Sequence, residues 1–324
     1  MPESDTEIPS RITFDPQHSE DGPPRRCPAP ADFRAEVESY DRLAEVGIWD
    51  GPHYRMTYRI LGQGPPLVLV PGIASTYRGY TLTLNRLSER FRTITYDYPG
   101  EHPDDGARLR KIKHNDLAAD VGGLLDHLGL GRAFLFGLSF GSTVVLKAIH
   151  DDPRRFPKAV VQGAFARRTF TGAERLALKF GRLMPGTSAR LPLRETILAY
   201  NNKMHFPREI EDRWPFYVEQ NGLTPIGPLA ARLDLLSKLD LRPLLREVRV
   251  ETLVLQGNED RIVSRKYFEE LCDSLPNSRG VIMPMVGHQP HYTHAEGLAQ
   301  AVTEWCLSCA PGGCPSEAQG SGSP

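Results

Sequence analysis

Short apolar runs alternate with helical patterns through most of this 324-residue chain. The runs are LVLV (67–70), RTITYD (92–97), AFLFG (133–137), AVVQGA (159–164), TLVLQG (252–257) and GVIMP (280–284). They are too short and too continuously apolar for amphipathic helices, and they are typical of strands buried on both faces of a parallel sheet. The stretches with helical periodicity are 81–91, 114–128, 142–151, 264–275 and 295–306. This alternation predicts an α/β fold with a doubly wound, mostly parallel sheet.

The alternation stops between about residues 165 and 245, where helical patterns with Pro and Gly breaks occur without any strand-like run. This break predicts a helical cap inserted between two strands, at the end of the sheet where open α/β folds bind ligands. Near the start, HYRMTYRILG (53–62) predicts an antiparallel hairpin or an edge strand, and the periodicity of residues 31–46 predicts a short helix.

The two ends of the chain differ in composition from the middle. Residues 1–30 are polar and Pro-rich, and residues 308–324 are rich in Gly, Ser and Pro. Neither end can bury much apolar surface, so we expect both to be disordered, on either side of one domain at 31–307. The N-terminus lacks the apolar core of a secretory signal, and no stretch approaches the roughly 20 apolar residues of a membrane span. We therefore expect a cytoplasmic protein.

The charges restrict the partners of the chain. Lys and Arg number 39 against 40 Asp and Glu, a net charge of −1, which excludes a globally basic nucleic-acid-binding protein. Locally, however, residues 165–208 hold nine basic and two acidic residues. The helix predicted in this segment has an apolar face formed by Leu176, Phe180, Leu183 and Met184. Beside it lies a basic face formed by Arg175, Lys179 and Arg182. The pattern predicts either an amphipathic lid helix with a solvated basic side or a surface that recruits an anionic partner, such as an acyl carrier protein or acyl-CoA.

The cysteines do not indicate a structural metal site or a disulfide framework. Cys306-Leu-Ser-Cys309, followed by Cys314, has a spacing found in metal and redox sites, but the second CxxC of a four-ligand zinc site is missing. We interpret these residues as free thiols in a reducing compartment.

The strongest chemical signal is Gly137-Leu138-Ser139-Phe140-Gly141, which ends one predicted strand and begins a predicted helix. A tight strand-to-helix turn with this pattern exposes the Ser Oγ at the carboxyl edge of the sheet. A Ser hydroxyl is a weak nucleophile until a base takes its proton, and a carboxylate usually orients that base. Asp260 and His288 each follow a later predicted strand, in the order Ser, Asp, His.

These motifs make the chain resemble the α/β-hydrolase fold family over roughly residues 55–307. The resemblance rests on LVLVPG, TYDYPG, GLSFG, QGNEDRIV and GH. It implies a nucleophile elbow at Ser139 and a catalytic triad completed by Asp260 and His288. The family usually places its acid in a G-x-x-D loop, which here is Gly257-Asn258-Glu259-Asp260. The adjacent Glu259 is the alternative acid.

The resemblance also implies an oxyanion hole formed by the backbone N–H groups of Ile73 and Phe140. In the family the first of these loops often reads H-G-x, whereas here it reads Pro71-Gly72-Ile73. The change from His to Pro removes a side chain that usually braces the loop, but it leaves the N–H of Ile73.

Other histidines raise weaker alternatives. His291 and His294 follow His288 at spacings of three, as in some metal clusters, but no pattern such as HExxH accompanies them, so we expect no metal ion. His102 lies in a loop that in the family borders the active-site end, and we interpret it as a solvated loop residue.

The resemblance implies a serine hydrolase of the carboxylesterase or thioesterase type, acting through an acyl-enzyme on a small-molecule ester or thioester, without a cofactor. An anionic or carrier-linked substrate would suit the basic face. A lyase, an acyltransferase or a perhydrolase of the same fold would share these residues. A non-catalytic ligand-binding protein on this scaffold is the alternative from another class. A Ser nucleophile argues against haloalkane dehalogenases and epoxide hydrolases, which use a carboxylate.

Overall fold

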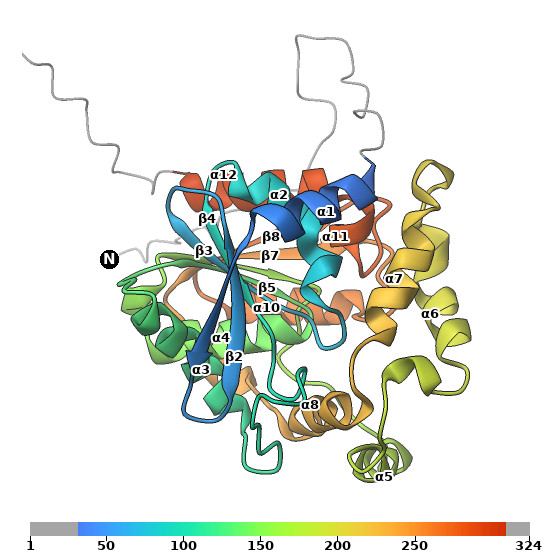
Figure 1. Cartoon of the computed structure of the whole chain (residues 1–324). Coiled ribbons are helices and arrows are strands. Elements are labelled where there is room, and N and C mark those ends of the chain that lie inside the picture. The colour runs from blue at the N-terminus through green and yellow to red at the C-terminus, as the bar shows by residue number, and fades with distance from the viewer. Residues whose placement is uncertain (1–31, 309–324) are drawn as a thin grey trace, which may run out of the picture.

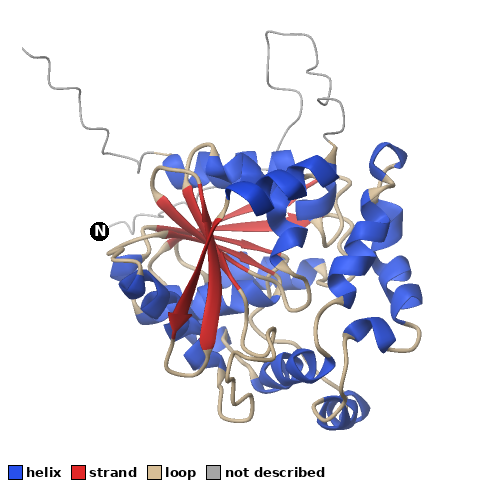
Figure 2. Ribbon diagram, in the orientation of Figure 1, coloured by secondary structure: helices blue, strands red, loops and turns tan. Residues whose placement is uncertain are grey.

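A twisted eight-stranded sheet runs through the centre of the computed structural model, which describes residues 32–308 (Figures 1 and 2). The strands are β1 (Glu45–Asp50), β2 (Arg55–Leu61), β3 (Pro66–Val70), β4 (Arg92–Tyr96), β5 (Phe134–Leu138), β6 (Lys158–Gln162), β7 (Glu251–Gly257) and β8 (Ser278–Met283). Their order is β1-β2-β4-β3-β5-β6-β7-β8. The two pairings made by β2 are antiparallel and all the others are parallel. The fold is therefore the predicted mostly parallel α/β sheet.

Helices cover both faces of this sheet (Figure 1). In chain order they are α1 (Phe33–Leu43), α2 (Thr81–Ser88), α3 (His114–His127), α4 (Phe140–Asp151), α5 (Gly172–Gly181), α6 (Arg194–Asn202), α7 (Arg213–Gly222), α8 (Ile226–Lys238), α9 (Arg242–Leu245), α10 (Arg265–Ser274), α11 (Pro290–Thr293) and α12 (Ala295–Leu307). Helices α1, α2 and α12 lie on one face, and α3, α4 and α10 lie on the other. None of the helices within 32–308 is long and apolar enough to cross a bilayer.

Strand β3 shows why the strand sequences are continuously apolar. Leu67 and Leu69 pack into the core beneath α2 and α12, whereas Val68 and Val70 pack into the core on the α3 and α4 side. All four side chains are fully buried. Successive residues of a strand point to opposite faces, so a strand covered on both faces requires an apolar residue at every position.

The start of the domain differs from the prediction for residues 31–46. Helix α1 ends at Leu43, and the edge strand β1 begins at Glu45 and pairs with β2 as an antiparallel hairpin. Val46, which fits the helical period, lies on β1 and is 60% exposed. An isolated apolar residue at a helical spacing is compatible with either element, and the pairing with β2 decides between them.

Between β6 and β7, residues 165–245 form α5 to α9. In Figure 1, α6 and α7 lie to the right of the sheet, and α5 and α8 lie at the bottom. No named strand lies in this segment, although two isolated β-bridges do, Arg167 with Asp240 and Thr187 with Pro225. We call α5 to α8 the cap. The predicted disordered segments 1–30 and 308–324 lie outside the described residues, except for Ser308.

A buried carboxyl group on α3 makes the stability of the domain depend on pH. Asp120 is 3% exposed, and its Oδ2 has no hydrogen-bond partner within the described part of the chain. Burial, with a smaller contribution from Asp116, raises the pKa of Asp120 to about 7. The folded protein therefore holds a proton on Asp120 that the unfolded chain, with a carboxyl pKa of about 4, releases.

We expect Asp120→Asn to stabilise the protein, and to do so more at pH 8 than at pH 5. Between about pH 4 and pH 7 only the folded state keeps the proton, so the wild type loses stability as the pH rises, and the amide removes this loss. The gain in unfolding free energy at pH 8 should be about 2–4 kcal/mol. Thermal unfolding at both pH values measures it, and an equal gain at the two values would contradict the argument.

Candidate active site

Ser139 lies at a sharp turn between the end of β5 and the start of α4. Its backbone has φ 51° and ψ −111°, a conformation that few non-glycine residues adopt. The turn is sterically possible only because Gly137 and Gly141, two residues before and after Ser139, have no side chains. A Cβ on Gly141 would lie 2.2 Å from the carbonyl oxygen of Val70, and a Cβ on Gly137 would lie 2.7 Å from that of Gly141. This is the geometry of a nucleophile elbow, which holds the hydroxyl away from the helix it precedes.

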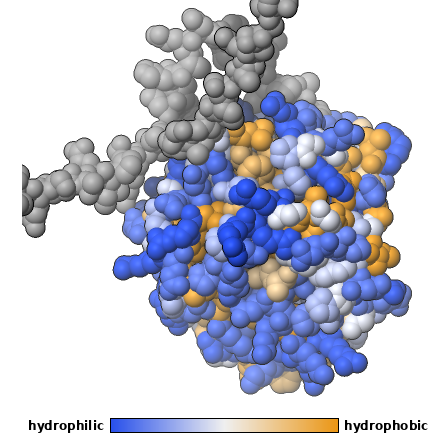
Figure 3. Space-filling model, turned by 90° about the vertical axis from the view of Figure 1, so that its left-hand side faces the viewer, coloured by the Kyte–Doolittle hydropathy of each residue, from blue (hydrophilic) through white to orange (hydrophobic). Residues whose placement is uncertain are grey.

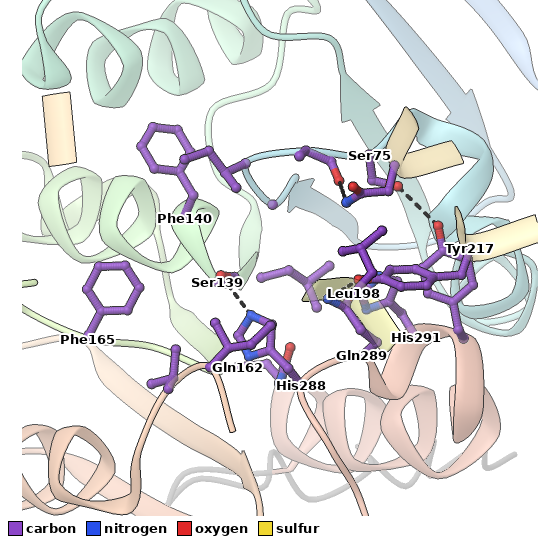
Figure 4. Close-up of a pocket in the computed structure, with 18 of the residues that line it drawn as sticks. Ser75, Ser139, Phe140, Gln162, Phe165, Leu198, Tyr217, His288, Gln289 and His291 are labelled. Carbon is purple, nitrogen blue, oxygen red and sulfur yellow. Dashed lines mark hydrogen bonds between the residues drawn. The ribbon is translucent and has the colours of Figure 1, made fainter. Parts of the chain in front are cut away.

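Three side chains from distant parts of the sequence form one hydrogen-bonded chain at this turn. His288 Nε2 lies 3.0 Å from Ser139 Oγ (Figure 4). On its other side, His288 Nδ1 lies 2.6 Å from Asp260 Oδ2. His288 is 5% exposed and the side chain of Asp260 is fully buried. Gly163 makes room for the imidazole, since a Cβ there would lie 2.8 Å from His288 Cε1. The arrangement allows His288 to take the Ser139 proton while Asp260 holds the ring.

The environment of Asp260 keeps it ionised. Burial alone would raise its pKa, but the neighbouring His288 and the hydrogen bonds that it accepts together lower the pKa below the usual range. Its Oδ1 accepts bonds from the N–H groups of Ile262 and Val263, both at 2.8 Å. The alternative acid, Glu259, points elsewhere: its Oε2 lies 3.2 Å from Nδ1 of His205 in the cap. Glu259 is therefore not part of the chain that reaches Ser139.

The two predicted oxyanion-hole residues both line the pocket around Ser139. Phe140 is the first residue of α4, so its N–H has no acceptor within the helix. Ile73 lies in the loop after β3. The preceding N–H, that of Gly72, already donates to Tyr80 Oη at 2.9 Å. The N–H groups of Ile73 and Phe140 therefore stay the predicted donors of the oxyanion hole.

The pocket that contains Ser139 and His288 has a volume of about 200 Å³. Its floor comes from residues at the carboxyl ends of the strands and its roof from the cap. The cap side chains are Leu198, Tyr217, Asn221, Leu233 and Leu236. The lining is mainly apolar, with a few polar groups and one exposed cation, Arg168. Such a lining suits a small, partly apolar organic molecule.

A family model described as alpha/beta hydrolase fold matches residues 65–295. The chain belongs to the α/β-hydrolase family. It is similar to a 2-hydroxy-6-oxo-6-phenylhexa-2,4-dienoate hydrolase of Burkholderia cepacia, with 23% identity over 76% of this chain and 89% of that protein. It is also 26% identical to a 2-(acetamidomethylene)succinate hydrolase of Mesorhizobium japonicum, over 85% of this chain and 99% of that protein. Among solved structures, a hydrolase from Pseudomonas aeruginosa PA01 superposes with a TM-score of 0.70 at 22% identity, covering 82% of this chain and 99% of that one. The protein is thus an enzyme, and its relatives are hydrolases.

In this α/β-hydrolase, tyrosines brace the loop whose usual His is replaced by Pro71. Tyr98 Oη donates to the carbonyl oxygen of Pro71 at 2.9 Å, and Tyr80 Oη accepts from the N–H of Gly72. Both rings are almost completely buried. Proline has no N–H and a fixed φ, so the loop needs fewer bonds to keep its shape. The tyrosines therefore supply the support whose loss the sequence suggested.

The sequence analysis did not assign Gln162 and His291 to the pocket, although it weighed His291 as a metal ligand. Gln162 ends β6 and is 1% exposed, and its Nε2 has no partner within the described residues. His291 is 4% exposed, and its Nδ1 is likewise unpartnered. Burial lowers the pKa of His291 to about 3, so the ring is neutral near pH 7. The position of Gln162 at a strand's carboxyl end was a usable signal, because open α/β sheets bind ligands there.

Two other residues singled out by the sequence, His102 and Cys306, lie apart from the pocket of this α/β-hydrolase. Within 32–308, no group of three or more His, Cys, Asp or Glu side chains is placed to hold a metal ion. His102 Nε2 lies 3.0 Å from Asp97 Oδ2, outside the set of pocket residues. Cys306 is buried, and burial raises the pKa of its thiol to about 12, which disfavours a reactive thiolate. Cys309 and Cys314 lie outside the described residues.

The basic face predicted on α5 is oriented differently from the prediction. Helix α5 packs against α8, where Arg182 Nη1 lies 2.8 Å from Asp234 Oδ2 and Arg175 donates to the carbonyl oxygen of Ser237. The prediction of a solvated basic side is therefore wrong for Arg182, which is half-buried, whereas Arg175 and Lys179 are exposed. Helix α8 presents a carboxylate and a carbonyl near its C-terminal end, and these groups attract guanidinium side chains.

Proposed function

We propose that this α/β-hydrolase cleaves a carboxylic ester or a thioester through an acyl-enzyme on Ser139. The observation that carries the proposal is the hydrogen-bonded chain from Ser139 Oγ through His288 to Asp260, at the floor of a small pocket. The roles assigned to these residues are predictions of the same proposal. They follow from the geometry and from the chemistry of a hydroxyl nucleophile.

The reaction runs in two halves. Ser139 Oγ attacks the carbonyl carbon as His288 Nε2 takes its proton, and the N–H groups of Ile73 and Phe140 stabilise the negative oxygen of the tetrahedral intermediate. The intermediate collapses, and His288 returns the proton to the leaving alcohol or thiol. Water then attacks the acyl-enzyme, again with His288 as the base, and releases the acid. Throughout, Asp260 stabilises the protonated imidazole.

The size and charge of the pocket favour a short, carboxylate-bearing substrate. A volume of about 200 Å³ is below the 300–1,000 Å³ of typical drug-sized sites, so we infer a compact acyl group. Arg168 supplies an exposed positive charge at the pocket. The two curated relatives described above carry dienoate and succinate in their names, both acidic compounds. An anionic ester would therefore pair with Arg168.

Carrier-linked substrates have less support in the structure than in the sequence pattern. Arg175 and Arg182, two of the three basic residues proposed to attract a carrier, bind α8. Reversing their charges would disturb the packing of the cap itself. An acyltransferase, a lyase or a perhydrolase would use the same Ser139 and differ in the molecule that meets the acyl group. A non-catalytic binding protein would leave Ser139 unreactive.

Labelling with a fluorophosphonate probe, beside a panel of substrates, tests the proposal. We expect labelling of Ser139 and turnover of short-chain chromogenic esters or acyl-CoA thioesters, with activity falling as the acyl chain lengthens. Absence of labelling would support the binding protein. Labelling with transfer to an added alcohol or peroxide, but no hydrolysis, would support a transferase or a perhydrolase.

A charged and a neutral ester of matched size test the role of Arg168. Arg168→Ala should raise KM for the carboxylate-bearing ester by about tenfold and leave the neutral ester unchanged. Arg167→Ala is the matched control, because Arg167 is an adjacent exposed arginine that is not among the pocket residues. Equal effects of the two variants would contradict an anionic substrate.

A further inference from the structure

Large apolar side chains are exposed on two helices of the cap. Fifteen large hydrophobic residues of 32–308 are exposed, and eight of them lie between 176 and 204. They are Leu176, Phe180, Leu183, Met184, Leu193, Ile197, Tyr200 and Met204, with exposed fractions from 46% to 74%. We call these eight residues the cap apolar face. Exposed hydrophobic residues are normally scattered singly over a protein surface, so eight of them in one short segment indicate an interaction site.

On α5 these residues form one stripe on the side away from the protein. Leu176 and Phe180 are four residues apart, which places them on one face of α5, and Leu183 lies in the turn just after the helix. The opposite side packs on α8: Leu178 is partly buried, and a Cβ on Gly181 would lie 3.1 Å from that of Ala230. The stripe is 54% to 69% exposed. The helix thus turns its most apolar face to solvent.

Helix α6 repeats this arrangement. Ile197 and Tyr200 are three residues apart on α6 and are 55% and 72% exposed. Leu193, which is 74% exposed, directly precedes the helix. The opposite side faces inward, where Leu198 lines the pocket and Asn202 donates to the carbonyl oxygen of Leu198 and to Tyr217 Oη. Both α5 and α6 lie on the outer side of the cap (Figure 1). Packing within the described residues therefore does not account for either stripe.

Positive charges accompany the cap apolar face. Residues 165–208 hold nine basic and two acidic residues, in a chain of net charge −1. Arg167 and Arg182 pair with aspartates and Arg194 is buried, so six exposed basic residues remain in this segment. Lys179 is exposed on α5 beside Leu176, and Lys203 is exposed just after α6. One of the two acids, Glu174, is bound to the N-terminus of α5 through Thr171. Leu, Ile and Phe flanked by Lys and Arg, on a helix of low overall hydrophobicity, are typical of helices that lie in the plane of a membrane surface.

The charge also argues against a second copy of the chain as the partner. A symmetric dimer through the cap apolar face would bring two strongly basic segments together, and like charges across an interface are unfavourable. We propose that the exposed stripes of α5 and α6 dock the cap onto a lipid bilayer with anionic headgroups. The apolar side chains enter the boundary of headgroups and acyl chains, and the Lys and Arg side chains stay among the phosphates. This docking does not depend on the substrate.

Co-sedimentation of the full-length protein with vesicles tests the docking. We expect binding to vesicles of phosphatidylcholine mixed with phosphatidylglycerol, and much weaker binding to phosphatidylcholine alone. Leu176→Ser with Phe180→Ser should lower the partition coefficient by about tenfold per side chain. Lys179→Gln with Lys203→Gln should lower binding to the anionic vesicles by about tenfold and bring it closer to the neutral value.

Val46→Ser with Ile48→Ser is the matched control. These residues are 60% and 55% exposed on β1, against 54% and 65% for Leu176 and Phe180. They lie on β1, an edge strand of the sheet, away from the cap (Figure 1). Hydrophilic side chains cover most of the side of the molecule that is on the left in Figure 1, with separate hydrophobic patches among them (Figure 3). The control variant should bind vesicles as the wild type does. All variants should keep the wild-type melting temperature and label with fluorophosphonate equally, because none of these side chains lines the pocket.

Three outcomes would overturn the proposal. Equal binding to neutral and anionic vesicles would contradict the role of the charges. Unchanged binding of the Leu176/Phe180 variant, or equal loss in the Val46/Ile48 control, would contradict the cap apolar face as the contact. A dimer in analytical ultracentrifugation that disappears in the Leu176/Phe180 variant would show that a second copy covers this face. Because the Ser139→Ala variant should bind vesicles normally, failure of the docking and failure of the proposed reaction are distinguishable.

Discussion

Replacing Ser139 by Ala, or His288 by Ala, is expected to lower kcat by about 10⁴-fold or more while the protein stays folded. Ser139 Oγ is the atom that would bond to the substrate, and His288 Nε2, 3.0 Å away, is the nitrogen placed to take its proton. Removing either group leaves only the pocket and the oxyanion donors to assist the reaction. Steady-state kinetics on the best ester of the panel, together with thermal unfolding, measure both parts of this prediction.

Ser75→Ala is the matched control for Ser139→Ala. Ser75 also lines the pocket, but its hydroxyl bonds to Tyr292 and to a backbone carbonyl, and not to His288. We expect at most a few-fold effect on kcat. If Ser139→Ala kept a rate within tenfold of the wild type, or still bound the fluorophosphonate, Ser139 would not be the nucleophile.

Asp260→Asn is expected to lower kcat by about 10⁴-fold, and Glu259→Gln by no more than a few-fold. Asp260 Oδ1 accepts two backbone N–H bonds, so the amide oxygen of Asn would take that place and its NH₂ group would face His288 Nδ1. Nδ1 would then have to accept a bond, and the ring proton would move to Nε2. An imidazole in that tautomer cannot take the proton of Ser139.

Comparing Glu259→Gln with Asp260→Asn tests whether kcat depends on where the carboxylate lies or only on its negative charge. Both changes remove one negative charge from neighbouring residues, but Glu259 contacts His205 and not His288. Measuring kcat of both variants under the same conditions makes this comparison. A dead Glu259→Gln beside an active Asp260→Asn would mean that the acid has been wrongly assigned.

Much of the fold could be predicted from local patterns. The β5 run AFLFG, for example, predicted a strand within a residue of the one observed, because burial on both faces leaves no polar position in a central strand. The helix expected at 114–128 begins at the predicted residue and ends one residue early. Among the strands of residues 32–308, only β1 was missed, because six residues at an edge need few apolar side chains and carry a weak pattern.

The sequence predicted those residues of the candidate site whose positions follow from the order of the strands along the chain. The motif around Ser139, and the places of Asp260 and His288 after later strands, follow from the fact that parallel strands bring their carboxyl ends to one edge. The structure brings these three residues together, and their catalytic roles stay predictions until the variants are assayed. Gln162 and His291 carry no motif, and their importance depends on burial and on unpartnered atoms, which are properties of the folded chain.

The sequence by itself determined the sheet, the elbow and the order of the reactive residues, because periodicity and turn chemistry act over a few neighbouring residues. The G-x-x-D spacing favoured Asp260 over Glu259, and the tertiary structure decided that Asp260 meets His288. The direction of each carboxylate depends on bonds to Ile262, Val263 and His205. The tertiary structure also decided which side of α5 faces solvent. The amphipathic pattern predicts two faces, but Asp234 on α8 attracts Arg182 inward and leaves the apolar side of α5 exposed.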